Sequence, residues 1–206
     1  MQLGEMTFGT NIKIPERQED DSYKLADYTL GFFGVGVAAL IRKDIHSLCR
    51  FGDSTEYAGS DLDKRMTEIY NSYPDEFKEL IIPCTIPLYN GSGAEDITRK
   101  VFAPTLTMVG GGGNEGVDEG FTWPIFTGRN SRKKTFNGSA AFWWLSSRLS
   151  SGRAWLVGAG GSGSIYGPSG AFGVVPAFVI PQSVQIDDTP DNDGSYRLTV
   201  LESYCS

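Results

Sequence analysis

The chain has 206 residues, of which 40% are hydrophobic and 21% charged, so it can bury a substantial core and does not have a disordered composition. Its net charge of −7 and its pI near 4.7 argue against a nucleic-acid or anionic-membrane partner, because both require a positive field. It lacks an 18-residue apolar run and the basic and apolar segments of a signal peptide, so we expect no membrane insertion and no leader.

Residues 1–28 are polar and include a charge run at residues 16–21. We expect an extended N-terminal arm here and treat it as a candidate contact in an assembly. A solvated loop between two strands is the alternative for the charge run. Residues 29–206 contain no linker-like composition and no repeat of fixed period, so they are expected to form a single domain.

Strands and two helices are expected in the first half of that domain. Residues 29–45 read as a pair of core strands in which Gly31, Gly34 and Gly36 mark bends or bulges. Ser60 is a suitable N-cap for a helix whose apolar face includes Leu62, Met66, Ile69 and Tyr70. A second, short helix is expected to start near Pro74 and to end before Pro83.

Strands and loops are expected in the remainder. Residues 86–89 and 101–109 read as strands, and residues 110–120 as a long flexible loop. An acidic turn at residues 187–194 is expected to lie between two strands, 184–186 and 196–202. Aligned with a calcium-binding EF-hand loop, this turn lacks carboxylates at the first and twelfth positions, so a hairpin turn with solvated carboxylates is the better interpretation.

The segment 138–180 opens on Trp143 and Trp144, continues through Gly and Ser with isolated large side chains, and closes on the apolar run 174–180. Its ends read as core strands, and its middle, from about Ser146 to Phe172, as loops displayed by a rigid scaffold. Aromatic anchors among small polar residues are typical of binding loops. The candidate ligand-binding residues are Arg148, Arg153, Trp155, Ser162, Ser164, Tyr166, Ser169 and Phe172.

No constellation of residues indicates catalysis, a cofactor or a metal. His46 is the single histidine, and the three cysteines, Cys49, Cys84 and Cys205, contain no CxxC pair. Gly158, Gly160 and Gly163 spell GxGxxG, but the following IYGPSG cannot begin the helix that a dinucleotide site requires. We therefore expect a protein that is not an enzyme.

The same segment resembles a known family. WWLSS at 143–147, AWLV at 154–157, Gly163 and GVVPAF at 173–178 are similar to the "WWLRS … aW.V … G … GVRPAF" signature of the DUF6273 family. Weaker similarities, YAGSDLDKRMTEI at 57–69 among them, extend the resemblance to roughly residues 30–180. Ser146 and Val175 stand where the family has arginines, so a function that depends on those arginines is not carried over.

The resemblance implies an α+β, C-type-lectin-like domain with twisted antiparallel sheets flanked by two short helices and with long loops. It also implies a displayed loop face of the kind that binds ligands in bacteriophage and gut-bacterial relatives. We therefore expect a virion protein of a bacteriophage, on a tail or head surface, assembled in the host cytoplasm. Its expected partners are other virion proteins, a host-surface protein or glycan, and a further copy of itself. The alternatives are an enzyme on a formylglycine-generating-like scaffold and a secreted or cell-surface bacterial adhesion or carbohydrate-binding module.

Overall fold

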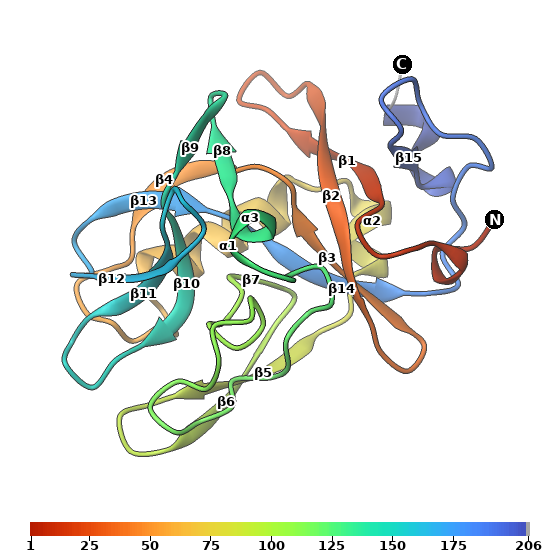
Figure 1. Cartoon of the computed structure of the whole chain (residues 1–206). Helices are drawn as coiled ribbons and strands as arrows, with labels where there is room; N and C mark the ends of the chain where they lie inside the picture. The colour runs from red at the N-terminus through yellow and green to blue at the C-terminus, as the bar shows by residue number, and fades with distance from the viewer. Residues whose placement is uncertain (205–206) are drawn as a thin grey trace.

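The protein was analysed as a computed structural model that describes residues 1–204, and it is an α+β domain built on two main sheets (Figure 1). The six-stranded sheet has the order β15-β1-β2-β3-β14-β7 and the five-stranded sheet the order β12-β11-β10-β13-β4. Most neighbouring strands are antiparallel, but β1–β15 and β10–β13 are parallel pairs.

The six-stranded sheet consists of β1 (Asn11–Arg17), β2 (Tyr23–Phe33), β3 (Val37–Arg42), β7 (Val101–Phe102), β14 (Ala177–Pro181) and β15 (Tyr196–Arg197). The five-stranded sheet consists of β4 (Ser47–Arg50), β10 (Trp143–Arg148), β11 (Ala154–Val157), β12 (Gly163–Tyr166) and β13 (Ala171–Val174). Two further hairpins are β5 (Cys84–Tyr89) with β6 (Ala94–Arg99), and β8 (Lys134–Phe136) with β9 (Ser139–Ala141).

The expected N-terminal arm is part of the six-stranded sheet. β1 pairs with β2 along its whole length and with β15 near the C-terminus, and the expected boundary at residue 28 falls inside β2. Leu3, Ile12 and Ile14 are fully buried. The sequence did not reveal that this segment is a buried strand, because polar residues alternate with the apolar ones. In addition, β15, which pairs with one edge of β1, comes from the far end of the chain.

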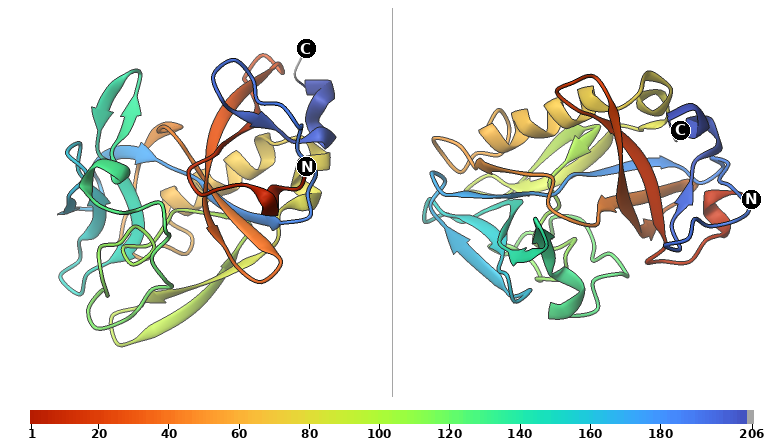
Figure 2. Two further views of the ribbon diagram at one scale, coloured as in Figure 1. Left: turned by 45° about the vertical axis from the view of Figure 1, so that its right-hand side comes forward. Right: turned by 90° about the horizontal axis from the view of Figure 1, so that it is seen from above.

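The two expected helices are confirmed. α1 (Asp61–Ser72) begins at Ser60, whose hydroxyl accepts a hydrogen bond from the Asp63 backbone amide, as an N-cap requires. α2 (Asp75–Leu80) begins after Pro74. Both helices lie along one side of the molecule, as the view from above shows (Figure 2). Tyr73 and Phe77 pack their rings on Phe178 of β14, with centroids 5.8 and 5.2 Å away.

Glycine forms the expected bends of the β2–β3 hairpin. The β2–β3 register shifts between Leu30 and Phe32, which leaves Gly31 as the extra residue of a bulge. A Cβ at Gly31 would lie 2.5 Å from the Trp123 ring, so the backbone approaches that ring closely. Gly36 in the hairpin turn has φ 71°, a conformation that glycine adopts without strain.

Three expected strands are shorter or absent. The strand expected at 101–109 ends at Phe102, and residues 103–109 are buried turns, while β6 occupies part of the loop expected before it. Residues 184–186 make only isolated bridges, from Gln185 to Gln2 and from Ile186 to Leu198, and residues 199–204 form the 3-10 helix η2 (Thr199–Tyr204). Short elements also occur at η1 (Leu3–Glu5) and α3 (Arg129–Arg132). None of the helices in residues 1–204 has the length and apolarity needed to cross a bilayer.

Deleting residues 1–28 should abolish cooperative folding, because the deletion removes β1, half of β2 and the buried side chains that they contribute. Circular dichroism during thermal unfolding measures this. A truncated chain that still unfolds in one sharp transition would instead support an arm that is dispensable for the fold.

Candidate functional site

The eight candidate binding residues do not form one surface, because strand alternation sends them to both faces of the five-stranded sheet. In the β11–β12 pair, Ala154 lies opposite Tyr166, whereas Trp155 lies opposite Ile165. Successive side chains of a strand point to opposite faces. Trp155 therefore faces away from Tyr166.

One face of this sheet carries a cluster of partly exposed rings, Phe142, Tyr166 and Phe172, which we call the aromatic face. Strand alternation places Ser164 on the same face, and Ser169 is exposed in the turn between β12 and β13. The Phe172 ring lies 4.9 Å from Tyr166 and 5.8 Å from Phe142. Tyr166 is 53% and Phe142 43% exposed. Contiguous apolar surface that is exposed to water is a feature of interaction sites.

Buried aromatic packing and a close backbone approach hold the aromatic face in place. The fully buried Trp144 packs edge-on against Phe172 at 5.0 Å, and its indole N–H donates to the Cys49 carbonyl at 3.0 Å. A Cβ at Gly170 would lie only 2.7 Å from both the Tyr166 and Phe172 rings. The glycine in this turn therefore allows the chain to pass close to the two rings. Phe142 was not among the predicted residues, although its position two residues before Trp144 places it on the same face.

Ser147 and Trp155, expected on or beside a displayed loop, belong to a hydrogen-bonded network, and Ser146 is buried next to Ser147. Ser146 and Ser147 are at most 1% exposed within β10. The Trp155 indole N–H donates to the Asn114 side chain at 2.9 Å, and Asn114 in turn donates to the Glu119 carboxylate at 3.0 Å.

Glu119 is the centre of that network. It is fully buried and accepts hydrogen bonds from the Ser147 hydroxyl and, at 2.9 Å, from the Tyr89 backbone amide. Burial raises the pKa of its carboxyl group. These contacts tie the 110–120 loop to β10, so the loop that the sequence presents as flexible is anchored by side chains.

Arg148 is also fixed in place rather than displayed. Its guanidinium pairs with Glu56 and donates to the Asn90 carbonyl at 2.5 Å. Both Arg148 and Ser146 line a pocket of about 80 Å³, and Arg148 Nε and Ser146 Oγ have no hydrogen-bond partner. This pocket has room for a few waters or one small polar group.

The remaining candidates, Arg153 and Ser162, lie in the turns at the two ends of β11. Arg153 is exposed in the β10–β11 turn, where its carbonyl accepts from the Leu149 amide at 2.8 Å. The Ser162 carbonyl accepts from the Gly158 amide at 2.8 Å, which closes a tight turn between β11 and β12. The GxGxxG glycines therefore lead into a strand and not a helix, so they do not form a dinucleotide site.

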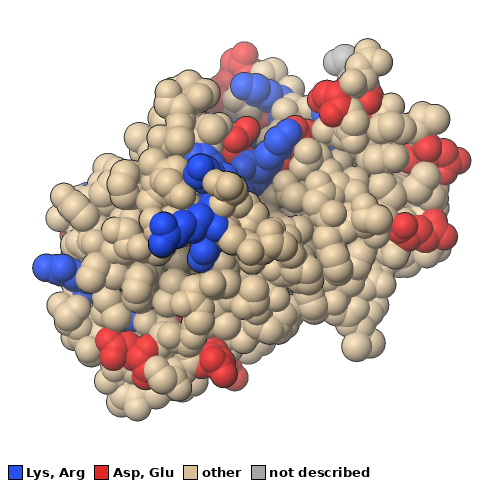
Figure 3. Space-filling model, in the orientation of Figure 1, with Lys and Arg blue, Asp and Glu red and all other residues tan. Residues whose placement is uncertain are grey.

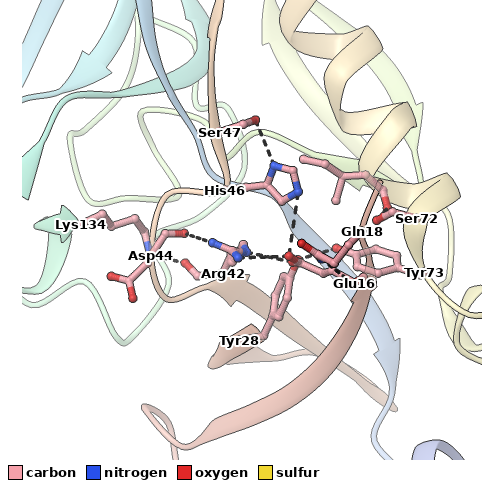
Figure 4. A network of polar contacts seen from close by, with 11 residues as sticks. Glu16, Gln18, Tyr28, Arg42, Asp44, His46, Ser47, Ser72, Tyr73 and Lys134 are labelled. Atoms are coloured by element: carbon pink, nitrogen blue, oxygen red, sulfur yellow. Dashed lines mark hydrogen bonds and ion pairs between the residues drawn. The ribbon is translucent and has the colours of Figure 1, made fainter. Parts of the chain in front are cut away.

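A second polar cluster surrounds Glu16 and contains the single histidine (Figure 4). Glu16 is only 4% exposed and forms a two-point ion pair with Arg42, with N–O distances of 2.9 and 3.1 Å. The Tyr28 hydroxyl donates to Glu16 at 2.7 Å and contacts the Tyr73 hydroxyl at 2.6 Å. This carboxylate therefore joins β1, β2, β3 and the C-terminal end of α1.

His46 lies between a carboxylate and a hydroxyl, but the distances do not fit a Ser–His–Asp type of catalytic triad. His46 Nδ1 lies 3.0 Å from Ser47 Oγ, whereas Nε2 lies 3.9 Å from Glu16, too far for a hydrogen bond. Arg42 already neutralises that carboxylate. Burial lowers the pKa of His46, so the ring is neutral at pH 7. We interpret it as a structural histidine.

The acidic turn at 187–194 carries ion pairs. Lys13 of β1 lies 3.1 Å from Asp191 and 2.7 Å from Asp193, and Arg197 lies 2.9 Å from Asp191. The hydrogen bond from Lys13 is the main cause that lowers the pKa of Asp193 to about 2, and the Ser195 backbone amide adds to it. The turn thus connects the C-terminal segment to β1. Residues 1–204 contain no group of three or more potential metal-ligating side chains.

Replacing Glu16 with Gln should destabilise the domain by about 2–4 kcal/mol, because the Arg42 guanidinium would lose its counter-charge in a buried setting. Urea unfolding of both proteins measures the difference. Glu19→Gln, an exposed change in the same hairpin, is the matched control and should stay within about 0.5 kcal/mol of the unmodified chain. Equal effects of the two changes would contradict a central role for Glu16.

Lys134 should make stability rise with pH between about 7 and 9. Its buried ammonium donates to the Arg42 and Lys43 carbonyls, and burial lowers its pKa to about 7. The unfolded chain, with an ordinary lysine pKa near 10.4, then binds more protons than the folded chain in this range. We expect a gain of about 1–2 kcal/mol in unfolding free energy that Lys134→Met lacks. Parallel pH dependences of both proteins would contradict this.

Comparison with known proteins identifies a family. The family model described as "Domain of unknown function (DUF6273)" matches residues 36–182. Neither the curated proteins nor the solved structures contain a significant match. The matched range covers the whole five-stranded sheet and, in the six-stranded sheet, β3, β7 and β14, while β1, β2 and β15 lie outside it. The aromatic face lies entirely within the matched range. Because the match spans more than half of the 206 residues, the chain belongs to the DUF6273 family.

Proposed function

We propose that this protein is a non-enzymatic attachment module of a bacteriophage virion, on a tail or head surface, with a C-type-lectin-like fold. Its aromatic face binds a host-surface protein or glycan. Other virion proteins hold it on the particle. The aromatic face carries this proposal, because it combines exposed rings with a rigid sheet beneath them.

The chemistry of the aromatic face suits recognition without catalysis. Tyr166 and Phe142 offer flat apolar surfaces, which stack on a partner's side chain or on the apolar face of a sugar ring. The hydroxyls of Ser164 and Ser169 lie beside them in sequence and add adaptable hydrogen bonds. Such contacts lose little conformational entropy, since the strands already fix the rings.

The arrangement of the chain supports the C-type-lectin-like fold. Helices α1 and α2 flank mainly antiparallel sheets, and long connections such as residues 103–128 cover them. The N- and C-terminal segments lie together, since β1 pairs with β15 and Gln2 bridges to Gln185. The flanking helices, the antiparallel sheets and the long connections are the features that the family resemblance implies.

The alternative of an enzyme on a formylglycine-generating-like scaffold has less support. Burial raises the pKa of Cys49 to about 11 and also raises that of Cys84, which disfavours the reactive thiolate. Cys205 lies outside the described residues. The second alternative, a secreted or cell-surface bacterial adhesion module, would use the same aromatic face and differs only in where the protein is found.

Replacing Phe142 and Tyr166 together with Ser should weaken binding to cells of related bacterial strains at least tenfold, because aromatic anchors dominate such contacts. Flow cytometry with the fluorescently labelled chain measures this. Val200→Ser removes a similarly exposed apolar side chain, 46% exposed, from η2 and should leave binding unchanged. Equal binding by all three proteins would rule out the aromatic face.

Mass spectrometry of purified virus particles from the source culture separates the two locations. Finding the chain in the particles supports the virion protein. Finding it only in the medium or on the bacterial surface supports the adhesion module instead.

A further inference from the structure

A large apolar pocket lies on the six-stranded sheet, on the face opposite α1 and α2. Val179 lines it, and the neighbouring Phe178 of the same strand points to the helices, so the two faces follow from strand alternation. The pocket has a volume of about 340 Å³ and no charged residue in its lining. Its aromatic walls are Phe32, Phe102, Phe121 and Trp123.

The pocket opens to the surface beside an exposed aromatic ring. Phe121 at its rim is 51% exposed and packs on Phe32 with centroids 4.2 Å apart. Pockets of this size and polarity bind apolar groups and exclude ions, because a charge would lose its hydration there without a partner.

The hairpin that forms one wall of this pocket ends in a protruding apolar tip. Residues 31–37, GFFGVGV, contain no polar side chain, and the tip projects from the body at the lower right of Figure 1. Val35 at the tip is fully exposed. The surface around the hairpin tip carries no acidic or basic side chain in Figure 3. Phe33 lies behind the tip and packs on Phe8, which is itself 45% exposed.

The tip and the pocket are adjacent parts of one surface. Phe32 and Val37, on either side of the tip, both line the pocket. A protrusion beside a cavity of matching polarity is self-complementary: a twofold rotation places each tip in the other copy's pocket.

We propose that the β2–β3 tip and this pocket form a twofold interface between two copies of the chain, with Val35 of each copy seated in the pocket of the other. The contact uses the six-stranded sheet and leaves the aromatic face of the five-stranded sheet free. It does not depend on the proposed attachment function.

Sedimentation velocity over a concentration series tests the interface. The unmodified chain should dimerise, and Val35→Asp should raise the dimer dissociation constant at least tenfold, because the pocket offers no partner for a carboxylate. Val200→Asp places the same charge on η2 as a matched control and should dimerise normally. Unchanged thermal unfolding of each variant shows that the fold is intact. A chain that stays monomeric over the whole concentration series, or a Val35→Asp variant that dimerises as before, would overturn the proposal.

The pocket's own thiol gives a second, geometric test. Cys84 lines the pocket, so Val35→Cys, made with Cys49 and Cys205 replaced by Ser, should form a disulfide-linked dimer on mild oxidation. Peptide mass spectrometry should find residue 35 of one copy joined to Cys84 of the other. Adding Cys84→Ser should abolish that linkage. Persistence of the same yield of covalent dimer without Cys84 would contradict the proposed seating of the tip.

Discussion

A buried carboxylate, Glu16, is the constraint on which much of this fold depends. Removing a charge from water is costly unless it is fully paired, and Glu16 receives an arginine and a tyrosine hydroxyl within hydrogen-bonding distance. Those partners come from β2 and β3, whereas Glu16 itself lies on β1, and Tyr73 adds the end of α1 through Tyr28. The network is satisfied only when β1, β2, β3 and the helix are in their final positions. It therefore specifies the arrangement as well as stabilising it.

The five-stranded sheet relies on a different arrangement, in which large buried rings support small exposed segments. Trp143 and Trp144 are fully buried on opposite faces of β10, and each indole N–H reaches a backbone carbonyl. With the strand anchored on both sides, the glycine- and serine-rich turns beyond it need little packing of their own. That arrangement allows Tyr166 and Phe142 to remain exposed without loss of order.

Glu119 anchors the 103–120 connection through buried hydrogen bonds, as Glu16 anchors the N-terminal strand β1. This segment has almost no regular secondary structure, yet residues 101–109 are buried. Its polar groups are met by side chains, including Thr105, Asn114 and Ser147, which replace the hydrogen bonds of a strand or helix. The segment also forms part of the wall of the apolar pocket, so the network helps to shape that surface.

The sequence by itself determined the local features. The N-cap at Ser60, the apolar spacing along α1, the bulge at Gly31 and the strand at Trp143 all follow from interactions between near neighbours, which a single sequence displays. It also contained the family signature. The residues that follow GxGxxG already excluded a dinucleotide site, because they cannot begin a helix. These features establish the class of fold and the family, but not a site.

Only the tertiary structure decided which residues are displayed. Glu16 and Asp193 read as solvated because their partners, Arg42 and Lys13, lie far away along the chain. Strand alternation predicts two faces, but it does not say which face another element covers; for this reason Ser147 and Trp155 are buried or fixed while Tyr166 is exposed. Register and coverage depend on contacts between distant segments, and those contacts also create the aromatic face and bring the hairpin tip beside its pocket.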